Sequence, residues 1–288
     1  MTQDPIQKHQ KIKPNYLLIL TFLLAVLGLF FPRTSNFSST NYEVSKLTEI
    51  NKQKEIRIGY EGYPPYTIED ANTGKLTGYS VDMAEYIAKE AGWKITWIKT
   101  KPETKITDLQ QNKFDLMVEP IFETIPRAAN VTFTNPYAYF GYAAGIVKKG
   151  DSRFKTIQDL NKKNIRIAVR LGYTDQTYVE NNLPLAEMRA MKADDVNQVF
   201  QDVIAGNSDV ALGDVEQVKG FAASHPDLVD TLFTQKPPAL VAAGFMLKQG
   251  DFTFYNYLNT CLDFLLSNGV LENLDKKYNI FVFRERKL

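Results

Sequence analysis

The residues best suited to bind a charged molecule follow short apolar runs of the sequence. Glu61 follows residues 56–60 (IRIGY), and Arg170 follows residues 165–169 (IRIAV). Such runs predict buried strands, and in open α/β sheets ligands bind beyond the carboxyl ends of the strands. Carboxylate and guanidinium groups at these places favour recognition of a small charged ligand through ion pairs and charge-assisted hydrogen bonds.

Residue counts exclude several other kinds of site. The 288 residues include one cysteine, Cys261, and two histidines, His9 and His225. These are too few for a disulfide framework or a cysteine-based zinc site, and they leave almost nothing for a histidine-ligated metal or a Ser-His relay. We therefore expect no metal and no cofactor. The 34 basic and 33 acidic side chains give a net charge of +1, which argues against a nucleic-acid-binding protein.

Residues 1–41 are predicted to be an export segment. Residues 16–31 form an unbroken 16-residue apolar run, which lysines precede and Ser/Thr/Asn-rich sequence follows. The excess of lysines before the run predicts a cytoplasmic N-terminus and an exported remainder. The run is short for a hydrocarbon core of roughly 30 Å but longer than many apolar h-regions of signal peptides. An uncleaved anchor and a cleaved signal both remain open, and the lack of an A-x-A-like site favours the anchor.

Beyond residue 54, alternating strand and helix patterns predict an α/β protein. Residues 80–91 carry one apolar stripe, with Ser80 as the expected N-cap and Gly92 just past the end, which predicts a helix. The other elements expected in this half are strands at 56–60, 93–98 and 114–118 and a helix at 106–112.

The second half repeats the plan of the first. Residues 203–214 (VIAGNSDVALGD) match residues 109–120 (LQQNKFDLMVEP). In each, a helix ends in a polar turn, an aspartate begins a short apolar strand, and an acidic residue lies near the end of that strand. A period of about a hundred residues is too long for a solenoid and predicts two similar lobes. We expect a two-lobed α/β fold in which each lobe is a mostly parallel sheet flanked by helices.

The two lobes are expected to join at a hinge and to face each other across a cleft. Lobe 1 is assigned to residues 55–140 and 244–288, and lobe 2 to residues 141–239. Strands where the chain enters and leaves lobe 2 are expected at residues 142–147 and 240–247. Two C-terminal helices are expected to pack back on lobe 1, at residues 252–267 and 270–278.

Five blocks of the chain match a known pattern in order and at compatible spacing. They are IRIGYEGYPPY (56–66), GKLTGYSVDMAEYIAKEAG (74–92), FDLMV (114–118), PRAANVTFTNPY (126–137) and RIAVRLGYT (166–174). Together they resemble the bacterial periplasmic solute-binding proteins of family 3, the amino-acid-binding components of ABC importers. This resemblance implies the type II periplasmic-binding-protein fold and an ABC permease as partner.

A narrower likeness involves an enzyme branch of the same fold. Four segments are similar to the periplasmic cyclohexadienyl dehydratases: NVTFTNPY (130–137), DSRFKTIQDL (151–160), DDVNQVFQDVIAGNSDV (194–210) and SHPDL (224–228). Those enzymes convert prephenate or arogenate to phenylpyruvate or phenylalanine. A shared fold does not by itself separate binding from catalysis.

The family resemblance implies ligand-binding roles for three residues. Arg127 is implied to hold the α-carboxylate of an amino acid, since a guanidinium offers two parallel N–H donors. Thr174, at the start of a predicted helix, has a hydroxyl and free backbone N–H groups that suit the same carboxylate. Asp214 is implied to accept the ligand's ammonium, although an aspartate there also suits the N-cap of the next helix.

Further residues in the first lobe are implied to surround the side chain of the ligand. Tyr63 and Tyr66 lie in a proline-rich loop at positions where the family has aromatic walls. Glu61 lies where the family often has an acidic residue that contacts the ligand's side chain.

The chain departs from the family at Glu119, Pro120 and Phe122, where small hydroxyl residues or glycine are common. Glu119 is expected either to accept an ammonium or cationic side chain, or to donate a proton if burial raises its pKa. Arg170 lies where amino-acid binders are often apolar. It is expected either to pair with Glu119 across the cleft or to contact an acidic ligand.

The expected function is capture of a small amino acid or related carboxylate for an ABC importer, on the extracytoplasmic side of the inner membrane. The dehydratase branch has a glutamate acid where this chain has Gln217, and an amide cannot donate that proton, so no catalytic residue is assigned. A cyclohexadienyl dehydratase and a membrane-tethered sensing module remain the alternatives.

Overall fold

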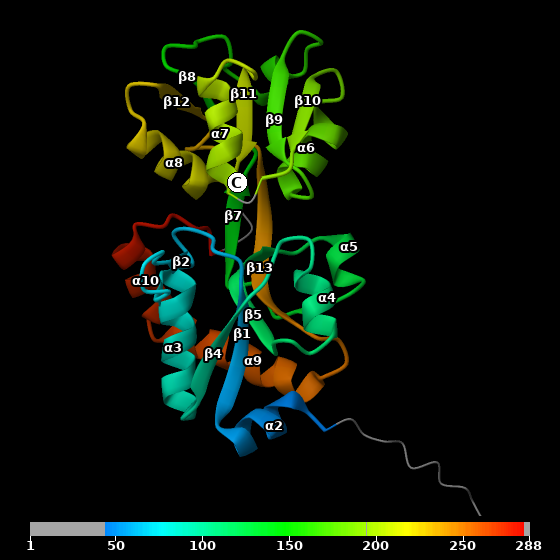
Figure 1. Ribbon diagram of the computed structural model, residues 1–288, viewed down its shortest axis with the longest axis vertical. Coiled ribbons are helices and arrows are strands. Elements are labelled where there is room, and N and C mark those ends of the chain that lie inside the picture. Colours follow the sequence, from blue (N-terminus) through cyan, green and yellow to red (C-terminus); the bar gives the residue numbers. More distant parts are fainter. Residues whose placement is uncertain (1–43, 194, 285–288) are drawn as a thin grey trace, which may run out of the picture. The chain divides into compact units, whose positions relative to one another are not determined.

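The computed structural model describes residues 44–193 and 195–284, drawn as a coloured ribbon in Figure 1. The expected export segment, with its apolar run at residues 16–31, lies outside this part of the chain. Within the described residues, no helix combines the length and the apolar character that crossing a bilayer requires. Two main sheets, each flanked by helices, form two lobes, so the expected two-lobed α/β fold is confirmed.

The sheet of lobe 1 has six strands in the order β4-β1-β5-β13-β6, with β7 also paired to β13. Strand β1 is parallel to β4 and β5, whereas β13 is antiparallel to β5, β6 and β7. The strands are β1 (Glu55–Tyr60), β4 (Lys94–Lys99), β5 (Leu116–Phe122), β6 (Thr132–Phe133), β7 (Ala138–Tyr142) and β13 (Ala239–Leu247). The lobe also contains the ribbon of β2 (Ile68–Glu69) and β3 (Leu76–Thr77), and the helices α2 (Lys46–Gln53), α3 (Tyr79–Ala91), α4 (Lys105–Gln110), α5 (Ile125–Ala128), α9 (Phe252–Ser267) and α10 (Val270–Tyr278).

The sheet of lobe 2 has five strands in the order β10-β9-β11-β8-β12. Strand β9 is parallel to β10 and β11, and β8 is antiparallel to β11 and β12. The strands are β8 (Ala144–Lys148), β9 (Arg166–Arg170), β10 (Glu187–Met191), β11 (Val210–Gly213) and β12 (Val229–Leu232). The helical segments are η1 (Ile157–Leu160), α6 (Thr174–Asn182), α7 (Val196–Ile204) and α8 (Val215–Ser224).

Both sheets are mixed, which corrects the expectation of mostly parallel sheets. The parallel pairs come from strands that are joined through helices, as parallel pairing requires. Strands β8 and β13, which lie where the chain passes between the lobes, instead run antiparallel to their neighbours. The limits expected for the lobes, between residues 140 and 141 and between 239 and 244, fall within β7 and β13 and remain a prediction.

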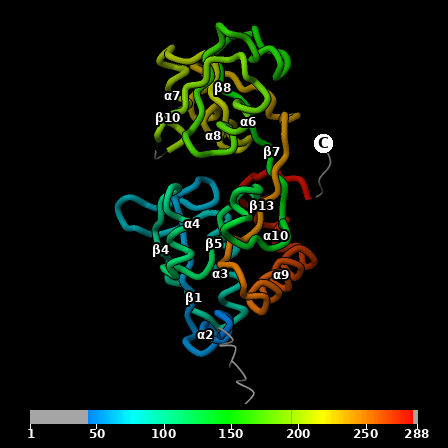
Figure 2. Tube along the Cα trace, turned by 90° about the vertical axis from the view of Figure 1, so that its right-hand side faces the viewer, coloured from blue at the N-terminus to red at the C-terminus, as the bar shows by residue number. Residues whose placement is uncertain are grey.

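Strands β7 and β13 lie side by side and extend between the two sheets (Figure 2). Their pairing runs from Ala239 opposite Tyr142 to Ala243 opposite Ala138. Beyond that point β13 continues along β5 in lobe 1. Ala143, between β7 and β8, is fully buried and has a φ of 58°. The strand expected at residues 240–247 corresponds to β13, and the strand expected at residues 142–147 corresponds to β8, whereas β7, which pairs with β13, was not predicted.

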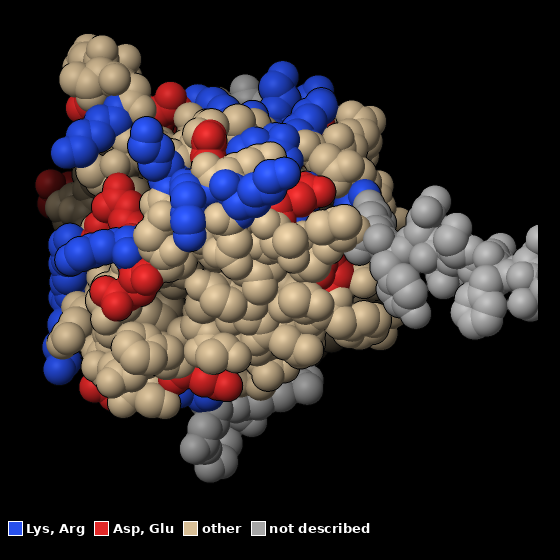
Figure 3. Space-filling model, turned by 90° about the horizontal axis from the view of Figure 1, so that it is seen from below, with Lys and Arg blue, Asp and Glu red and all other residues tan. Residues whose placement is uncertain are grey.

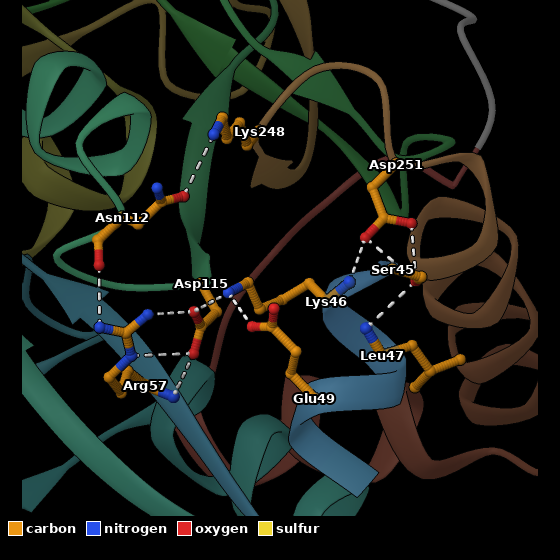
Figure 4. Close-up of polar contacts among 9 residues, drawn as sticks. All are labelled: Ser45, Lys46, Leu47, Glu49, Arg57, Asn112, Asp115, Lys248 and Asp251. Atoms are coloured by element: carbon orange, nitrogen blue, oxygen red, sulfur yellow. Dashed lines mark hydrogen bonds and ion pairs between the residues drawn. The ribbon is translucent and has the colours of Figure 1, made fainter. Parts of the chain in front are cut away.

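The aspartate just before β5 holds two parallel strands together (Figure 4). Asp115 Oδ2 accepts hydrogen bonds from the backbone N of Arg57 at 3.0 Å and from its Nε at 3.2 Å. In lobe 2, Asp209 Oδ2 accepts from the backbone N and the Nε of Arg166 at 3.0 and 3.1 Å. The aspartates of the sequence repeat thus make the same contact in each lobe.

The N-cap of helix α3 lies two residues earlier than expected. Its N-cap is Gly78, not Ser80, and Ser80 is buried inside the helix. Gly78 has a φ of 127°, and a Cβ there would lie 2.4 Å from the backbone O of Tyr66. Only glycine fits this close approach, so backbone packing places the helix start.

The C-terminal helices α9 and α10 have the expected limits and pack on lobe 1. Leu258 and Leu262 of α9 belong to the same buried cluster as Ile56 and Ile58 of β1. Asp251 caps α9 by accepting from Phe254 N, and it also accepts from the backbone of α2 and from Ser45 Oγ (Figure 4).

Seen from below, the molecule presents Lys and Arg side chains beside Asp and Glu side chains (Figure 3).

Candidate ligand-binding site

A small cavity lies where strand ends of the two lobes meet. Its volume is about 30 Å³, enough for one or two water molecules. It is lined by Glu61, Tyr63, Lys105, Glu119, Pro120, Ile121, Phe122, Arg127, Arg170, Tyr173 and Thr174. Six of the eight residues expected to bind ligand are on this list; Tyr66 and Asp214 are not.

Glu61, just past the end of β1, forms a buried ion pair. Its Oε1 lies 2.6 Å from Lys105 Nζ, and the exposed fractions of the two side chains are 9% and 7%. Glu61 Oε2 accepts a hydrogen bond from Tyr173 Oη of lobe 2 at 3.3 Å. Burial lowers the pKa of Lys105, and the nearby Glu61 opposes that shift. The charge of Glu61 is therefore already balanced within lobe 1.

Glu119 lies in the middle of β5, and 1% of its surface is exposed. Its Oε2 accepts a hydrogen bond from the backbone N of Glu61 at 3.0 Å, and its Oε1 has no hydrogen-bond partner among the described residues. Burial, followed by repulsion from Glu61, raises the pKa of Glu119 to about 7. A carboxyl group with this pKa is protonated in about half of the molecules at neutral pH.

Arg127 is placed by the short helix α5. Thr124 Oγ1, at the N-cap, accepts from the backbone N of Arg127 at 3.4 Å. The side chain turns back so that Nη1 donates to the backbone O of Phe122 at 2.9 Å. Burial lowers the pKa of the guanidinium. Within the described residues no carboxylate oxygen lies within 4.0 Å of it.

Arg170 ends β9, and 9% of its surface is exposed. Its guanidinium carbon lies 3.4 Å from the centre of the Tyr173 ring, a stacked cation–π contact. Arg170 Nε is buried and has no hydrogen-bond partner among the described residues. The expected pair between Arg170 and Glu119 is not present. Thr174 follows Tyr173 as the first residue of α6, as the helix prediction required.

Asp214 follows β11 and is the N-cap of α8, whose Gln217 N donates to its Oδ1 at 2.9 Å. Its Oδ2 accepts from Tyr63 Oη of lobe 1 at 2.6 Å, so both oxygens are already hydrogen-bonded. Burial raises the pKa of Asp214 to about 6. Asp214 thus contacts Tyr63, which lines the cavity, but does not line the cavity itself.

Tyr66 lies in the core of lobe 1, with 1% of its surface exposed. Its ring contacts Tyr79 and Phe140 edge to face, and Tyr63 at a tilt. Contrary to the expectation from the sequence, Tyr66 therefore does not form a wall of the cavity. Tyr66 supports Tyr63 from behind, because the loop turns the two rings toward each other.

Lys105 and Tyr173 line the cavity without having been singled out from the sequence. Lys105 begins α4, and a lysine next to an apolar helical pattern normally indicates an exposed face. Only its partner Glu61, which is distant in sequence, explains its burial. Tyr173 could have been predicted from the sequence, since it adjoins Thr174 in the segment that resembles the family.

A larger cavity of about 650 Å³ adjoins the small one. Tyr63 and Arg170 line both cavities. The larger one is also lined by Glu216, Gln217 and Lys219 of α8 and by Phe281. Glu216 and Lys219 form an ion pair at 3.3 Å.

Comparisons with known proteins match most of the described chain. A model of the bacterial extracellular solute-binding proteins, family 3, matches residues 56–281. A probable histidine-binding protein of Campylobacter jejuni is 29% identical, over 91% of this chain and 98% of its own. A cyclohexadienyl dehydratase of Pseudomonas aeruginosa is 23% identical, over 81% and 86%. The crystal structure of an ancestral amino-acid-binding protein, a precursor of cyclohexadienyl dehydratase, has a TM-score of 0.73 and 30% identity, and the match covers 81% of this chain and 99% of that one.

Proposed function

Because the chain belongs to the bacterial extracellular solute-binding proteins of family 3, we propose that it binds a small amino acid between its lobes for an ABC importer. The observation that carries this proposal is the half-buried guanidinium of Arg127, which faces the interlobe cavity without a carboxylate partner among the described residues. The related histidine-binding protein and ancestral amino-acid-binding protein support the ligand class.

In this proposal the α-carboxylate of the ligand binds Arg127 through two parallel N–H donors. The N-terminus of α6, with the hydroxyl of Thr174, adds donors from the second lobe. Glu119 has a free oxygen for the ligand's ammonium, and Asp214 becomes available when Tyr63 moves.

A cavity of about 30 Å³ is too small for any amino acid, so binding requires the lobes to separate first. Two hydrogen bonds between the lobes, Tyr63 to Asp214 and Tyr173 to Glu61, must then open. Strands β7 and β13 are the natural hinge for this motion, and closure around the ligand would present the form that a permease recognises. Residues 16–31 are proposed to export the protein and to hold it at the extracytoplasmic face of the inner membrane.

The proposal is tested by calorimetric titration of the purified full-length chain with a panel of amino acids. We expect one class of amino acid to bind. Arg127→Gln should weaken its affinity by roughly 10- to 100-fold, because a charged hydrogen bond is lost. Arg153→Gln, which changes a half-exposed arginine paired with Asp151, is the matched control and should bind normally. Unchanged binding by Arg127→Gln would contradict the proposal.

A dehydratase is the second candidate, favoured by one feature of Glu119. A buried carboxyl group with a pKa of about 7 and a free oxygen can act as a general acid near neutral pH. Incubation with prephenate and with arogenate distinguishes the two functions, since the binding proposal expects no phenylpyruvate or phenylalanine. Product formed by the normal protein and lost in Glu119→Gln would establish the enzyme instead.

A further inference from the structure

Two arginines differ from all the others in the described part of the chain. Arg57, Arg153, Arg166, Arg189 and Arg284 each have an aspartate oxygen within 4.0 Å. Arg127 and Arg170 have no carboxylate within that distance among the described residues. Both line the small interlobe cavity, one from each lobe. The unpaired guanidinium groups are therefore concentrated in one place.

Burying a cation without an anion is costly unless a bound anion completes the site. Arg170 is nine-tenths buried, and its Nε lacks any partner among the described residues. The stacking of its guanidinium on Tyr173 fixes the group in place and leaves its N–H edge for other acceptors. Arg127 uses Nη1 for a backbone oxygen and has further N–H donors available.

The carboxyl groups around the cavity do not supply the anions that Arg127 and Arg170 require. Glu61 is paired with Lys105 at 2.6 Å, so these two charges cancel. Glu119 is half protonated near neutral pH and hydrogen-bonds to the backbone of Glu61. Asp214 accepts from Tyr63 and from Gln217 N. Asp214 stays mostly ionised at neutral pH, but among the described residues no carboxylate lies within 4.0 Å of either guanidinium, so N–H donors of Arg127 and Arg170 are left for a ligand.

We propose that the ligand carries two carboxylate groups, one for Arg127 and one for Arg170, and is an acidic amino acid. This inference rests on the proposed function and narrows its ligand class. A planar guanidinium binds a carboxylate through two parallel hydrogen bonds, and each lobe supplies one such group. Arg170 also lines the adjacent cavity of about 650 Å³, which gives room for the second carboxylate beyond the small cavity.

Matched pairs of ligands test this proposal. The full-length chain is titrated calorimetrically with glutamate and glutamine, with aspartate and asparagine, and with lysine and arginine. In each acid–amide pair the acid should bind at least about tenfold more tightly, since a charged hydrogen bond is stronger than a neutral one. Arg170→Gln should lose this preference and still bind the amide, whereas Arg153→Gln should keep it.

Several results would overturn the proposal. If glutamine or a basic amino acid binds more tightly than glutamate, the acidic ligand class is wrong although amino-acid binding stands. If no amino acid in the panel binds, the proposed function fails with it. Glutarate, which has two carboxylates but no ammonium, tests the two-carboxylate site separately from the amino-acid ligand. If glutarate binds as tightly as glutamate, the two-carboxylate site is supported and an amino-acid ligand is contradicted. Arg170→Lys, which keeps the charge, should retain part of the preference for glutamate and controls for misfolding.

Discussion

Glu119 shows how its surroundings set the behaviour of a single carboxyl group. It lies within a strand whose residues are all buried, and the carboxylate of Glu61 repels its negative charge. Both effects disfavour the ionised form, so its pKa rises to about 7. Burial likewise raises the pKa of Asp175 to about 7. Its Oδ1 accepts a hydrogen bond from Ala143 N at the hinge.

A raised pKa of a buried acid makes stability depend on pH. Between the unfolded value of 4.5 and the folded value of about 7, the unfolded chain releases the proton of Glu119 first. The free energy of unfolding therefore falls as pH rises through this window. We expect Glu119→Gln to gain stability relative to the normal protein as pH rises from 4 to 8, by at most about 3 kcal/mol. Urea unfolding of the ligand-free protein across this range measures the difference, and a difference independent of pH would contradict the assignment.

At the scale of elements, each lobe depends on one aspartate that connects two parallel strands. Asp115 accepts from the backbone and side chain of Arg57, and Asp209 does the same with Arg166. In both lobes the aspartate N also donates to the arginine backbone O at 2.9 Å. Each aspartate therefore forms an ion pair with the arginine and also hydrogen bonds that join the two strands in register.

Removing either aspartate should destabilise its lobe to a similar degree. Asp115→Ala and Asp209→Ala each leave a backbone N–H of the neighbouring strand without its acceptor, and the expected cost is about 2 kcal/mol. Asp230→Ala is the control: Asp230 pairs with Lys149 and accepts from Gly150 N at the exposed surface, where water can replace both contacts, so its loss should cost less than about 1 kcal/mol. Urea denaturation midpoints compare the three variants. A cost for Asp115→Ala as small as that of the control would show that the contact is not a structural one.

For the whole molecule, the contact between the lobes at the site is the feature that controls access. Tyr63 Oη donates to Asp214 Oδ2 at 2.6 Å, and Tyr173 Oη donates to Glu61 Oε2 at 3.3 Å. Each bond joins a residue of one lobe to a residue of the other. Loss of either bond shifts the balance toward separated lobes.

Tyr63→Phe should favour the open form of the ligand-free protein. The substitution removes a hydrogen bond to a carboxylate, worth about 1.5 to 3 kcal/mol, and keeps the ring that packs against Tyr66. Small-angle X-ray scattering should then give a larger radius of gyration than for the normal chain. Tyr255→Phe, which loses a contact with Asn135 inside lobe 1, should leave the radius unchanged. Equal radii for Tyr63→Phe and the normal chain would mean that this bond does not hold the lobes together.

Local patterns were sufficient for much of the fold. Helices α9 and α10, strands β8 and β13 and the repeated aspartates Asp115 and Asp209 were all predictable, because each depends on residues within one short segment. The start of α3 was not, since it depends on the approach of Gly78 to the backbone of Tyr66. The mixed sheets were missed for a similar reason: strand direction depends on where β8 and β13 enter each sheet.

The sequence by itself determined the two-lobed α/β plan, the family, and six of the residues that line the interlobe cavity, because periodicity, turn residues and ordered motifs are properties of the linear chain. Only the tertiary structure decided how the charges of that cavity are paired. It joined Lys105 to Glu61, moved Tyr66 into the core, and left Arg127 and Arg170 without carboxylates among the described residues. The physical reason is that ion pairing and burial depend on distances in space between segments far apart in sequence.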